Sequence, residues 1–206
     1  MPTENTLVLH GFRLSGHSHR AELMLNLLGL DYGFRHVDLR AGEQKSPAFL
    51  ALNSLGAVPV LTDGGVTIAD SVAILAYLTQ RYDPERRWLP TDPVAAGKVQ
   101  RWFSIAQGPV YAGPARARVI KRFGGDPADH ARAVAAADAF LPVLDAELTG
   151  RDFLVGDTAT AADVALYSYV STAPEGEVSL QPYPAIRAWL ARIEALPRFL
   201  PMPTSL

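Results

Sequence analysis

The chain has 206 residues, which is enough for one large domain or for two small ones that share an interface. Hydrophobic residues make up 49% and charged residues 19%, and the net charge of −2 gives no electrostatic attraction to nucleic acid or to anionic lipid. There is no cysteine, which excludes disulfides, zinc-thiolate sites and a thiol nucleophile supplied by the chain. Any sulfur chemistry would therefore have to use the sulfur of a ligand.

The sequence carries no recognisable targeting or membrane-spanning segment. It has no continuous apolar run of the length that crosses a bilayer, and its start, Met1-Pro-Thr-Glu-Asn, lacks the basic and apolar parts of a signal peptide. We therefore expect a cytoplasmic protein with no membrane and no nucleic-acid partner.

The first eighty residues have the pattern of a small α/β layer. Hydrophobic periodicity predicts, in chain order, a strand over 6–12, a helix over 21–30, a strand over 34–39, a helix over 47–52, a hairpin of strands 58–61 and 67–69, and a helix over 71–82. Ser46 is expected to cap the second helix, and Asp70 or Ser71 the third. The order β-α-β-α-β-β-α predicts a compact domain whose first two strands are parallel.

The second half of the chain is different, because it shows only helical periods. Three prolines among charged residues mark 83–93 as a linker, so the predicted domains are 1–82 and 94–206. The helices are expected over 94–120, 127–148, 161–172 and 185–196. Gly108-Pro109 and Gly113-Pro114 should bend the first of these helices, and Thr160 with Asp163 should form a capping box at the third.

The segment 57–71, Ala-Val-Pro-Val-Leu-Thr-Asp-Gly-Gly-Val-Thr-Ile-Ala-Asp-Ser, has the features of a binding surface. Pro59 has no N–H, so the backbone of Val58 is left to pair with an extended peptide outside the sheet. The free backbone N–H groups at the start of the following helix can hold a carboxylate. The alternative interpretation is an ordinary hairpin followed by a capped helix.

Several separated motifs extend this observation over nearly the whole chain. They are the Ser15 loop, Asn53-Ser-Leu-Gly-Ala-Val-Pro-Val-Leu, Asp70-Ser-Val-Ala-Ile-Leu-Ala-Tyr-Leu, and Phe153-Leu-Val-Gly-Asp-Thr-Ala-Thr-Ala-Ala-Asp163. In this order they resemble the cytosolic glutathione transferases, most closely the theta-like and related bacterial serine-type members. The resemblance implies an α/β thioredoxin-like N-terminal domain that binds glutathione, plus an all-α C-terminal helical domain that contributes the electrophile-binding site.

The resemblance also implies a role for individual residues at the glutathione site. Gln44 and Lys45 would hold the glycyl carboxylate, and Val58 before Pro59, in a bond whose cis or trans state the sequence leaves open, would pair with the cysteinyl backbone. Asp70 and Ser71 would hold the γ-glutamyl amine and carboxylate.

Three positions depart from the pattern of the theta-type members. Gln44 stands where histidine is usual, Ala57 where lysine is usual, and Asp70 where glutamate is commoner. Each departure could weaken glutathione binding, but none removes the serine expected to activate the thiol.

Activation of the thiol is the chemistry that the resemblance implies. A free thiol has a pKa of about 8.5 and only its thiolate is a good nucleophile, so a hydroxyl that hydrogen-bonds the anion raises the reactive fraction. The resemblance makes Ser15 the first candidate, and its position after the first strand, near the start of a helix whose dipole favours an anion, agrees with that role. Ser18 is the alternative, although it could instead cap that helix.

Other polar residues near Ser15 keep two interpretations. His17 and His19 could act as a base or as positive charge beside a thiol, or they could be packing or surface residues. Arg20 could attract ligand carboxylates, or it could be a solvated arginine in the first turn. His10, His36 and His130 form no arrangement that suggests a metal, so we expect no metal cofactor.

The second substrate is expected to contact the first helix of the second domain. The candidates for an apolar wall with one cation are Trp102, Phe103, Ile105, Tyr111 and Arg116. Ordinary helix packing is the alternative for each of the aromatic residues.

The sequence thus predicts a glutathione transferase that moves alkyl or aryl groups, in the manner of a detoxification enzyme, with glutathione as co-substrate and a small hydrophobic electrophile. The alternatives are a glutathione-dependent reductase, peroxidase or lyase on the same fold, or a non-catalytic ligand-binding homologue. The resemblance further implies a homodimer.

Overall fold

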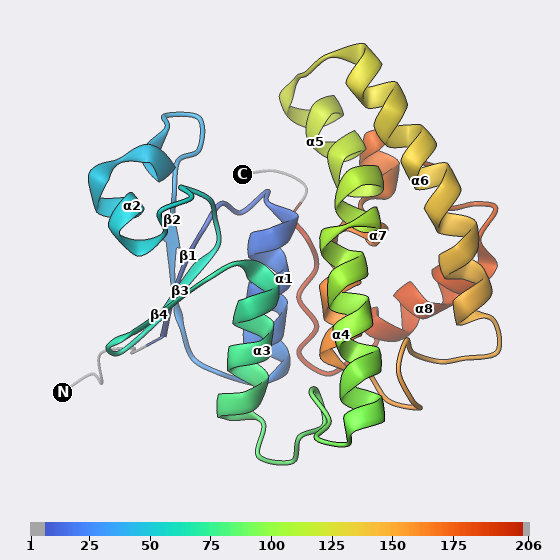
Figure 1. The fold of residues 1–206 in the computed structure, drawn as a ribbon, viewed down its shortest axis with the longest axis horizontal. Coiled ribbons are helices and arrows are strands. Elements are labelled where there is room, and N and C mark those ends of the chain that lie inside the picture. Colours follow the sequence, from blue (N-terminus) through green and yellow to red (C-terminus); the bar gives the residue numbers. More distant parts are fainter. Residues whose placement is uncertain (1–6, 204–206) are drawn as a thin grey trace. The chain divides into compact units, whose positions relative to one another are not determined.

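The computed structural model describes residues 7–203 and divides the chain into two compact units (Figure 1). Among the described residues, the first unit contains 7–85 together with 197–203, and the second contains 86–196. The sequence predicted that the C-terminal residues belong to the helical domain, whereas 197–203 pack with the first unit; residues 1–6 and 204–206 of the predicted domains lie outside the described residues. One contact that joins 197–203 to the first unit runs from His19 Nε2 to the carbonyl oxygen of Leu200, at 2.9 Å.

The first unit is a four-stranded mixed sheet with helices on both faces. Its elements are β1 (Leu7–Gly11), α1 (Gly16–Leu27), β2 (Gly33–His36), η1 (Glu43–Lys45), α2 (Pro47–Leu52), β3 (Val60–Asp63), β4 (Val66–Ala69) and α3 (Ser71–Tyr82). The strand order is β2-β1-β3-β4. As predicted, β1 and β2 are parallel, and the other two pairs are antiparallel. This is the thioredoxin-like α/β arrangement that the sequence indicated.

Helices α1 and α3 contact each other on one side of this sheet, and α2 lies on the opposite side (Figure 1). Under α2, Phe49 packs with Val37 and Val60, and all three are buried. Ser46 accepts the Phe49 N–H at 3.2 Å and so caps α2 as predicted.

The observed boundaries differ from the predicted ones most clearly at α1, which begins at Gly16 instead of residue 21. Ser18, His19 and Arg20 lie inside the helix and are buried. A pattern based on apolar residues missed the first turn because polar side chains occupy its buried positions. Strand β2 is shorter than predicted and ends at His36, whereas β3 has the predicted length but is shifted by two residues, to Val60–Asp63.

The second unit is all helical, as the sequence predicted. It contains α4 (Pro93–Gln107), η2 (Tyr111–Ala115), α5 (Arg116–Phe123), α6 (Pro127–Leu148), α7 (Ala161–Ser171), η3 (Ala173–Gly176) and α8 (Pro184–Glu194). The helix predicted over 94–120 is not continuous, because Gly108 leaves helical geometry and a π-helical turn containing Pro114 follows. The predicted bends are confirmed, and the single helix was wrong.

Helix α7 forms the centre of this unit, and each of its residues from 161 to 170 is buried. The predicted capping box is present, with Asp163 accepting the backbone N–H of Thr160 at 2.8 Å. Asp163 also accepts from the Leu154 N–H and from Trp189 Nε1, at 3.0 and 2.9 Å. This carboxylate therefore ties α7 to α8 and to the segment before α7. No helix in the described part of the chain is both long and apolar enough to cross a membrane.

Candidate glutathione site

Three segments of the first unit converge at one edge of the sheet. His10 near the end of β1 pairs with Val60 at the start of β3, and Val60 pairs with Ala69 at the end of β4. The residues just beyond these positions therefore lie along the same edge: the loop to Ser15, the Val58-Pro59 segment, and Asp70 with Ser71. The sequence places these segments far apart, and the register brings them together.

Ser15 is the N-cap of α1. Its backbone is extended, and its Oγ accepts the N–H of Ser18 at 3.3 Å. The side chain is half-buried, and its hydroxyl hydrogen has no acceptor among the described residues. Ser15 can therefore offer that hydrogen to a ligand while it continues to cap the helix.

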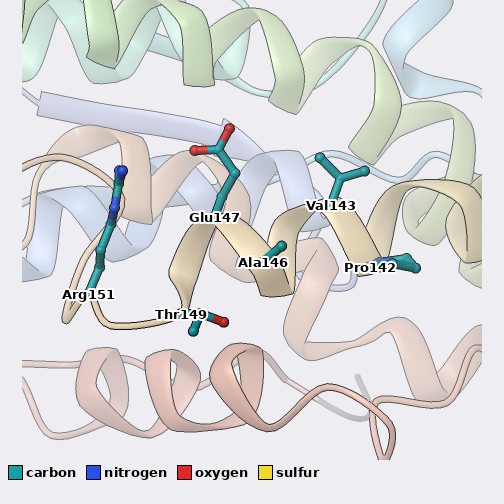
Figure 2. A pocket seen from close by; sticks show the side chains of 6 residues that line it. All are labelled: Pro142, Val143, Ala146, Glu147, Thr149 and Arg151. Carbon is teal, nitrogen blue, oxygen red and sulfur yellow. The ribbon is translucent and has the colours of Figure 1, made fainter.

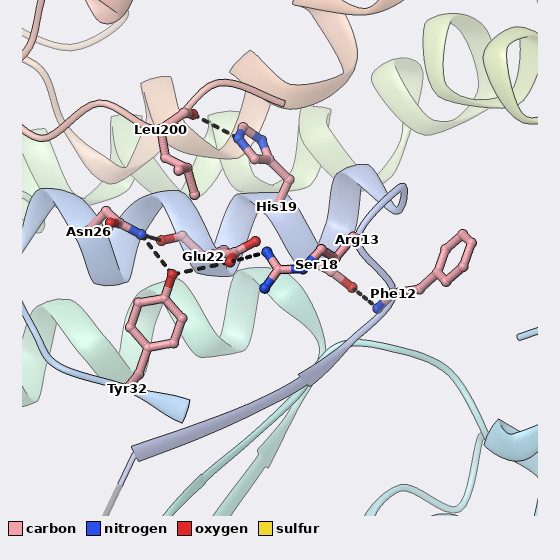
Figure 3. Close-up of polar contacts among 8 residues, drawn as sticks. All are labelled: Phe12, Arg13, Ser18, His19, Glu22, Asn26, Tyr32 and Leu200. Atoms are coloured by element: carbon pink, nitrogen blue, oxygen red, sulfur yellow. Dashed lines mark hydrogen bonds and ion pairs between the residues drawn. The ribbon is translucent and has the colours of Figure 1, made fainter. Parts of the chain in front are cut away.

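Ser18 has a different position from the one that the cap interpretation assigned to it. It lies in the first turn of α1 and is fully buried, and its Oγ accepts the backbone N–H of Phe12 at 3.1 Å (Figure 3). The helix begins at Gly16, so Ser18 is not the N-cap, and that interpretation was wrong. Its hydroxyl holds the loop between β1 and α1 against the helix.

A buried polar network continues along the same side of α1 (Figure 3). Glu22 is 3% exposed and accepts from Arg13 Nη1 and from the Tyr32 hydroxyl, both at 3.2 Å. Burial raises the pKa of the Glu22 carboxyl, and Arg13 opposes that change. Because Arg13 belongs to the loop that precedes Ser15, this ion pair fixes the loop to the second turn of the helix.

On another side of α1, Arg20 and His17 reach the start of α3. Arg20 Nη1 lies 3.0 Å from Ser71 Oγ and 3.2 Å from His17 Nδ1. His17 Nδ1 in turn lies 3.1 Å from Ser71 Oγ. Arg20 is fully buried, and Ser71 is 1% exposed. Burial, with a further contribution from Arg20, lowers the pKa of His17 to about 3, so its imidazole is neutral at physiological pH.

Asp70 is the N-cap of α3, where the sequence allowed either Asp70 or Ser71. Its Oδ1 accepts the N–H groups of Val72 and Ala73, at 2.8 and 3.0 Å. Its φ of 79° lies in a region that residues other than glycine rarely adopt, and such a conformation costs about 1–3 kcal/mol. Because Asp70 is exposed, a ligand can reach this helix terminus from the side on which Asp70 lies.

The Val58-Pro59 peptide bond is cis. The backbone N–H and C=O of Val58 make no hydrogen bond to another described residue, and Val58 is half-buried just before β3. Both groups are thus available to an extended peptide that lies along this edge of the sheet.

Gln44 and Lys45 lie in η1 and border the segment that leads to Val58. Lys45 Nζ donates to the carbonyl oxygen of Leu55 at 3.0 Å, and Gly56 packs so closely that an added Cβ would meet the Gln44 carbonyl oxygen at 2.7 Å. Gly56 has a φ of 58°, which favours glycine. Gln44 Oε1 is buried without a partner among the described residues.

Comparisons with known proteins identify the family of the chain. Residues 9–86 match the family model described as glutathione S-transferase, N-terminal domain, and residues 109–197 match the C-terminal domain of the same family. A maize protein named glutathione S-transferase 3 is 33% identical over 203 residues, with 94% of this chain and 91% of the relative covered. The chain belongs to the glutathione S-transferase family.

The relatives do not all carry the name of a transferase. A Ralstonia protein named maleylpyruvate isomerase is 34% identical, with 87% of this chain and 88% of the relative covered. The glutathione S-transferase structure from Pseudomonas fluorescens has a TM-score of 0.86 at 34% identity, covering 96% of this chain and 98% of that one. A Drosophila mojavensis homologue with bound glutathione has a TM-score of 0.83 at 30% identity, covering 93% and 89%.

The residues predicted to contact the second substrate all belong to the second unit. Trp102 and Phe103 are each 3% exposed, which is the burial of core side chains, and Arg101 lies 4.7 Å over the Trp102 ring. Ile105 is half-buried and Tyr111 is exposed. Arg116 pairs with Asp129 of α6 at 3.5 Å.

An open pocket of about 570 Å³ lies elsewhere in this unit, near the end of α6 (Figure 2). Its lining residues are Pro142, Val143, Ala146, Glu147, Thr149 and Arg151. None of them was predicted to bind substrate, and Glu147 is already paired with Arg101 at 2.7 Å. Within residues 7–203, no cluster of three or more His, Asp or Glu side chains has the arrangement of a metal site.

Sequence reasoning left the functions of His17 and Arg20 open and did not include them among the site residues. Both are polar residues in a helical turn, and their spacing of three residues is the only local signal that they share a face. Their common partner, Ser71, is 51 residues from Arg20 in the chain. A single sequence does not reveal such a contact.

Proposed function

We propose that this member of the family is a glutathione transferase in which Ser15 activates the glutathione thiol. The observation that carries the proposal is the hydroxyl of Ser15, which uses its oxygen to cap α1 and keeps its hydrogen unpaired among the described residues. Donated to a sulfur anion, this hydrogen stabilises the thiolate and so lowers the thiol pKa. The N-terminus of α1 adds a favourable dipole.

The burial of Ser18 supports Ser15 as the activating residue. Ser18 Oγ accepts the Phe12 N–H and is fully buried, whereas Ser15 is half-buried at the sheet edge. A ligand sulfur would have to displace the packing around Ser18 to reach it.

The remaining parts of glutathione have complementary groups along the same edge. The backbone of Val58 suits the cysteinyl residue, and Gln44 and Lys45, beside the segment before Val58, suit the glycyl carboxylate. At the other end, Asp70 supplies a negative charge for the γ-glutamyl amine, and Ser71 begins a helix whose first N–H, that of Ser71, and whose dipole favour a carboxylate. The bound glutathione in the Drosophila mojavensis homologue supports this ligand.

In the proposed reaction the thiolate sulfur forms a bond to an electrophilic carbon, and the leaving group departs with the bonding electron pair. No base is needed at that step, because the proton has left the thiol already. Of the residues predicted to contact a small hydrophobic electrophile, Ile105, Tyr111 and Arg116 remain the proposed contacts, because Trp102 and Phe103 are each 3% exposed. Detoxification in the cytoplasm is the proposed setting.

A glutathione-dependent isomerase is the second candidate, carried by the 34% identity to the Ralstonia maleylpyruvate isomerase. A thiolate that adds to a conjugated double bond makes that bond single, and elimination of the same thiolate after rotation returns the isomer. Product analysis separates the two reactions, because the transferase consumes glutathione and the isomerase regenerates it.

The experiment that tests the proposal is an ultraviolet difference titration of glutathione into the protein at a series of pH values. Thiolate absorption that appears well below the ordinary thiol pKa of about 8.5 is the expected result. Binding without this absorption would contradict activation at Ser15, and absence of binding at millimolar glutathione would indicate a homologue that has lost the ligand.

We also propose that two copies pair through α3 and α4. This follows from family resemblance. Gel filtration should then give a mass near twice the 22.2 kDa of one chain, and a mass near 22.2 kDa would contradict it.

A further inference from the structure

The contacts of Arg20 determine where the hydrogens of the Arg20, His17 and Ser71 cluster lie. A guanidinium only donates, so His17 Nδ1, 3.2 Å from Arg20 Nη1, must carry a lone pair. The neutral imidazole therefore has its hydrogen on Nε2. Ser71 Oγ accepts from the same Nη1 at 3.0 Å and lies 3.1 Å from His17 Nδ1, so we assign its hydrogen to the one lone pair of Nδ1, which it shares with Arg20 Nη1.

We propose that Arg20 is the electrostatic partner of the γ-glutamyl carboxylate, acting through the Ser71 hydroxyl, and that His17 is a positioning residue that keeps Arg20 Nη1 directed at Ser71. This inference rests on the proposed function, because it concerns the same glutathione site. It gives roles to two residues whose functions the sequence left open.

The first argument is the location of the charge. Arg20 is fully buried, and its Nη1 contacts the first residue of α3. Two of the first N–H groups of α3 are taken by Asp70, and the Ser71 N–H has no partner among the described residues. A carboxylate at this terminus would meet both a helix N-terminus and a buried positive charge, which water screens weakly.

The second argument is the chemistry of the Ser71 hydroxyl. A hydroxyl that accepts from a cation is polarised and becomes a stronger donor. Its hydrogen rotates freely, and an ionised carboxylate is a better acceptor than a neutral imidazole. When the ligand binds, the Ser71 hydrogen turns from His17 Nδ1 to the carboxylate, and Arg20 retains both of its contacts.

The test compares two peptides on two proteins. One peptide is glutathione, and the other is 4-aminobutanoyl-cysteinyl-glycine, which lacks only the γ-glutamyl carboxylate. The variant is Arg20→Met, which keeps an unbranched apolar chain in a buried position and removes the charge. Dissociation constants are measured by isothermal titration calorimetry with the full-length protein.

We expect Arg20→Met to weaken glutathione binding about 10- to 30-fold, as for the loss of a partly screened charge near a carboxylate. Binding of the decarboxylated peptide should change less than twofold. Arg118→Met is the matched control, because Arg118 is also fully buried but lies in the second unit, where it pairs with Glu175. It should leave the ratio of the two affinities unchanged.

Each other outcome has a definite meaning. Equal weakening of both peptides would show that Arg20 only supports the structure, and an unchanged glutathione affinity would overturn the inference directly. If the wild-type protein does not bind glutathione, the proposed function fails first, and this result is distinguishable from the other two.

If Arg20→Met does not fold, Arg20→Lys answers the same question. Lysine keeps the charge and has three donors on its nitrogen, but it lacks the planar fork of the guanidinium and cannot hold Ser71 and His17 in the same geometry. Glutathione binding should therefore fall about three- to tenfold with no effect on the decarboxylated peptide. Equal effects on the two peptides, or no effect on either, would again overturn the inference.

Discussion

Ser15 Oγ accepts the backbone N–H of Ser18 at 3.3 Å, so the residue proposed to activate the thiol is also the N-cap of α1. One hydroxyl therefore has two tasks that use different atoms. The oxygen lone pair stabilises the helix, and the hydrogen is left for a ligand. A substitution at Ser15 changes both properties, and an experiment has to separate them.

Ser15→Ala should raise the pKa of the bound thiol and lower kcat about 10- to 100-fold, as for the loss of a hydrogen bond to a charged group. It should leave the glutathione Kd within about threefold, because the other contacts of the peptide remain. The pKa is measured by thiolate absorption of the complex as a function of pH. Ser15→Thr, which keeps the hydroxyl and a good cap, should retain most of the activity.

Ser15→Ala should also lose about 1 kcal/mol of stability, because the N-cap of α1 is missing. Asp92→Ala is the matched control for that loss, since Asp92 caps α4 through the Ala95 N–H at 2.8 Å. It should cost similar stability without moving the thiol pKa. A silent Ser15→Ala together with an inactive Ser18→Ala would show that the activating serine is assigned wrongly.

Asp70→Asn should separate the charge of Asp70 from its cap. Asparagine can accept the Val72 and Ala73 N–H groups and tolerates positive φ, so unfolding free energy should change by less than about 1 kcal/mol. Glutathione affinity should fall about 10- to 100-fold, the effect of a lost charge-assisted hydrogen bond. Glutaryl-cysteinyl-glycine, which lacks the γ-glutamyl amine, should bind the variant and the wild-type protein equally. Equal losses for both peptides would contradict the role of the charge.

His17 should make stability depend on pH. Its pKa is lowered from 6.5 to about 3 in the folded chain, so between these values the unfolded chain binds more protons at this position. The free energy of unfolding therefore falls as the pH decreases towards 3, by about 2 kcal/mol between pH 7.5 and 5.0. Urea unfolding of wild-type protein and His17→Asn at pH 7.5 and 5.0 measures this, and the variant should lose about 2 kcal/mol less. The same loss in both proteins would show that His17 becomes protonated in the folded state.

The sequence predicted most of the fold because the second unit and the sheet are specified by local patterns. Asp126 before Pro127 starts α6 at the predicted residue, and that helix ends at Leu148 as predicted. Local patterns failed where buried positions are polar, as in the first turn of α1. They also failed at the π-helical turn, where Gly113 packs so closely on α6 that an added Cβ would lie 2.8 Å from the Ala137 nitrogen.

The candidate site could be predicted only in part. Ser15, Val58 and Asp70 belong to motifs that can be recognised in short stretches of sequence. The strand register then places their segments at one edge of the sheet. The contact of Arg20 with Ser71 depends instead on how α1 packs against α3. Helix packing is set by many side chains at once, and no short motif encodes it.

Asp163 offers a last test, of the core of the second unit. Asp163→Ala would leave the Leu154 and Thr160 N–H groups and Trp189 Nε1 buried without their acceptor. Because unpaired buried donors cost about 1–3 kcal/mol each, we expect the unfolding free energy to fall by about 3–5 kcal/mol. Urea unfolding followed by tryptophan fluorescence measures the change.

The matched control is Asp126→Ala, which removes an exposed cap whose Oδ1 accepts the Ala128 N–H at 2.8 Å. That variant should lose about 1 kcal/mol. Asp163→Asn should lie between the two, because its carbonyl oxygen still accepts while its amide group faces other donors. If Asp163→Ala costs no more than Asp126→Ala, then water or a rearranged backbone satisfies the three donors, and Asp163 acts as an ordinary cap instead of the link between α7 and α8.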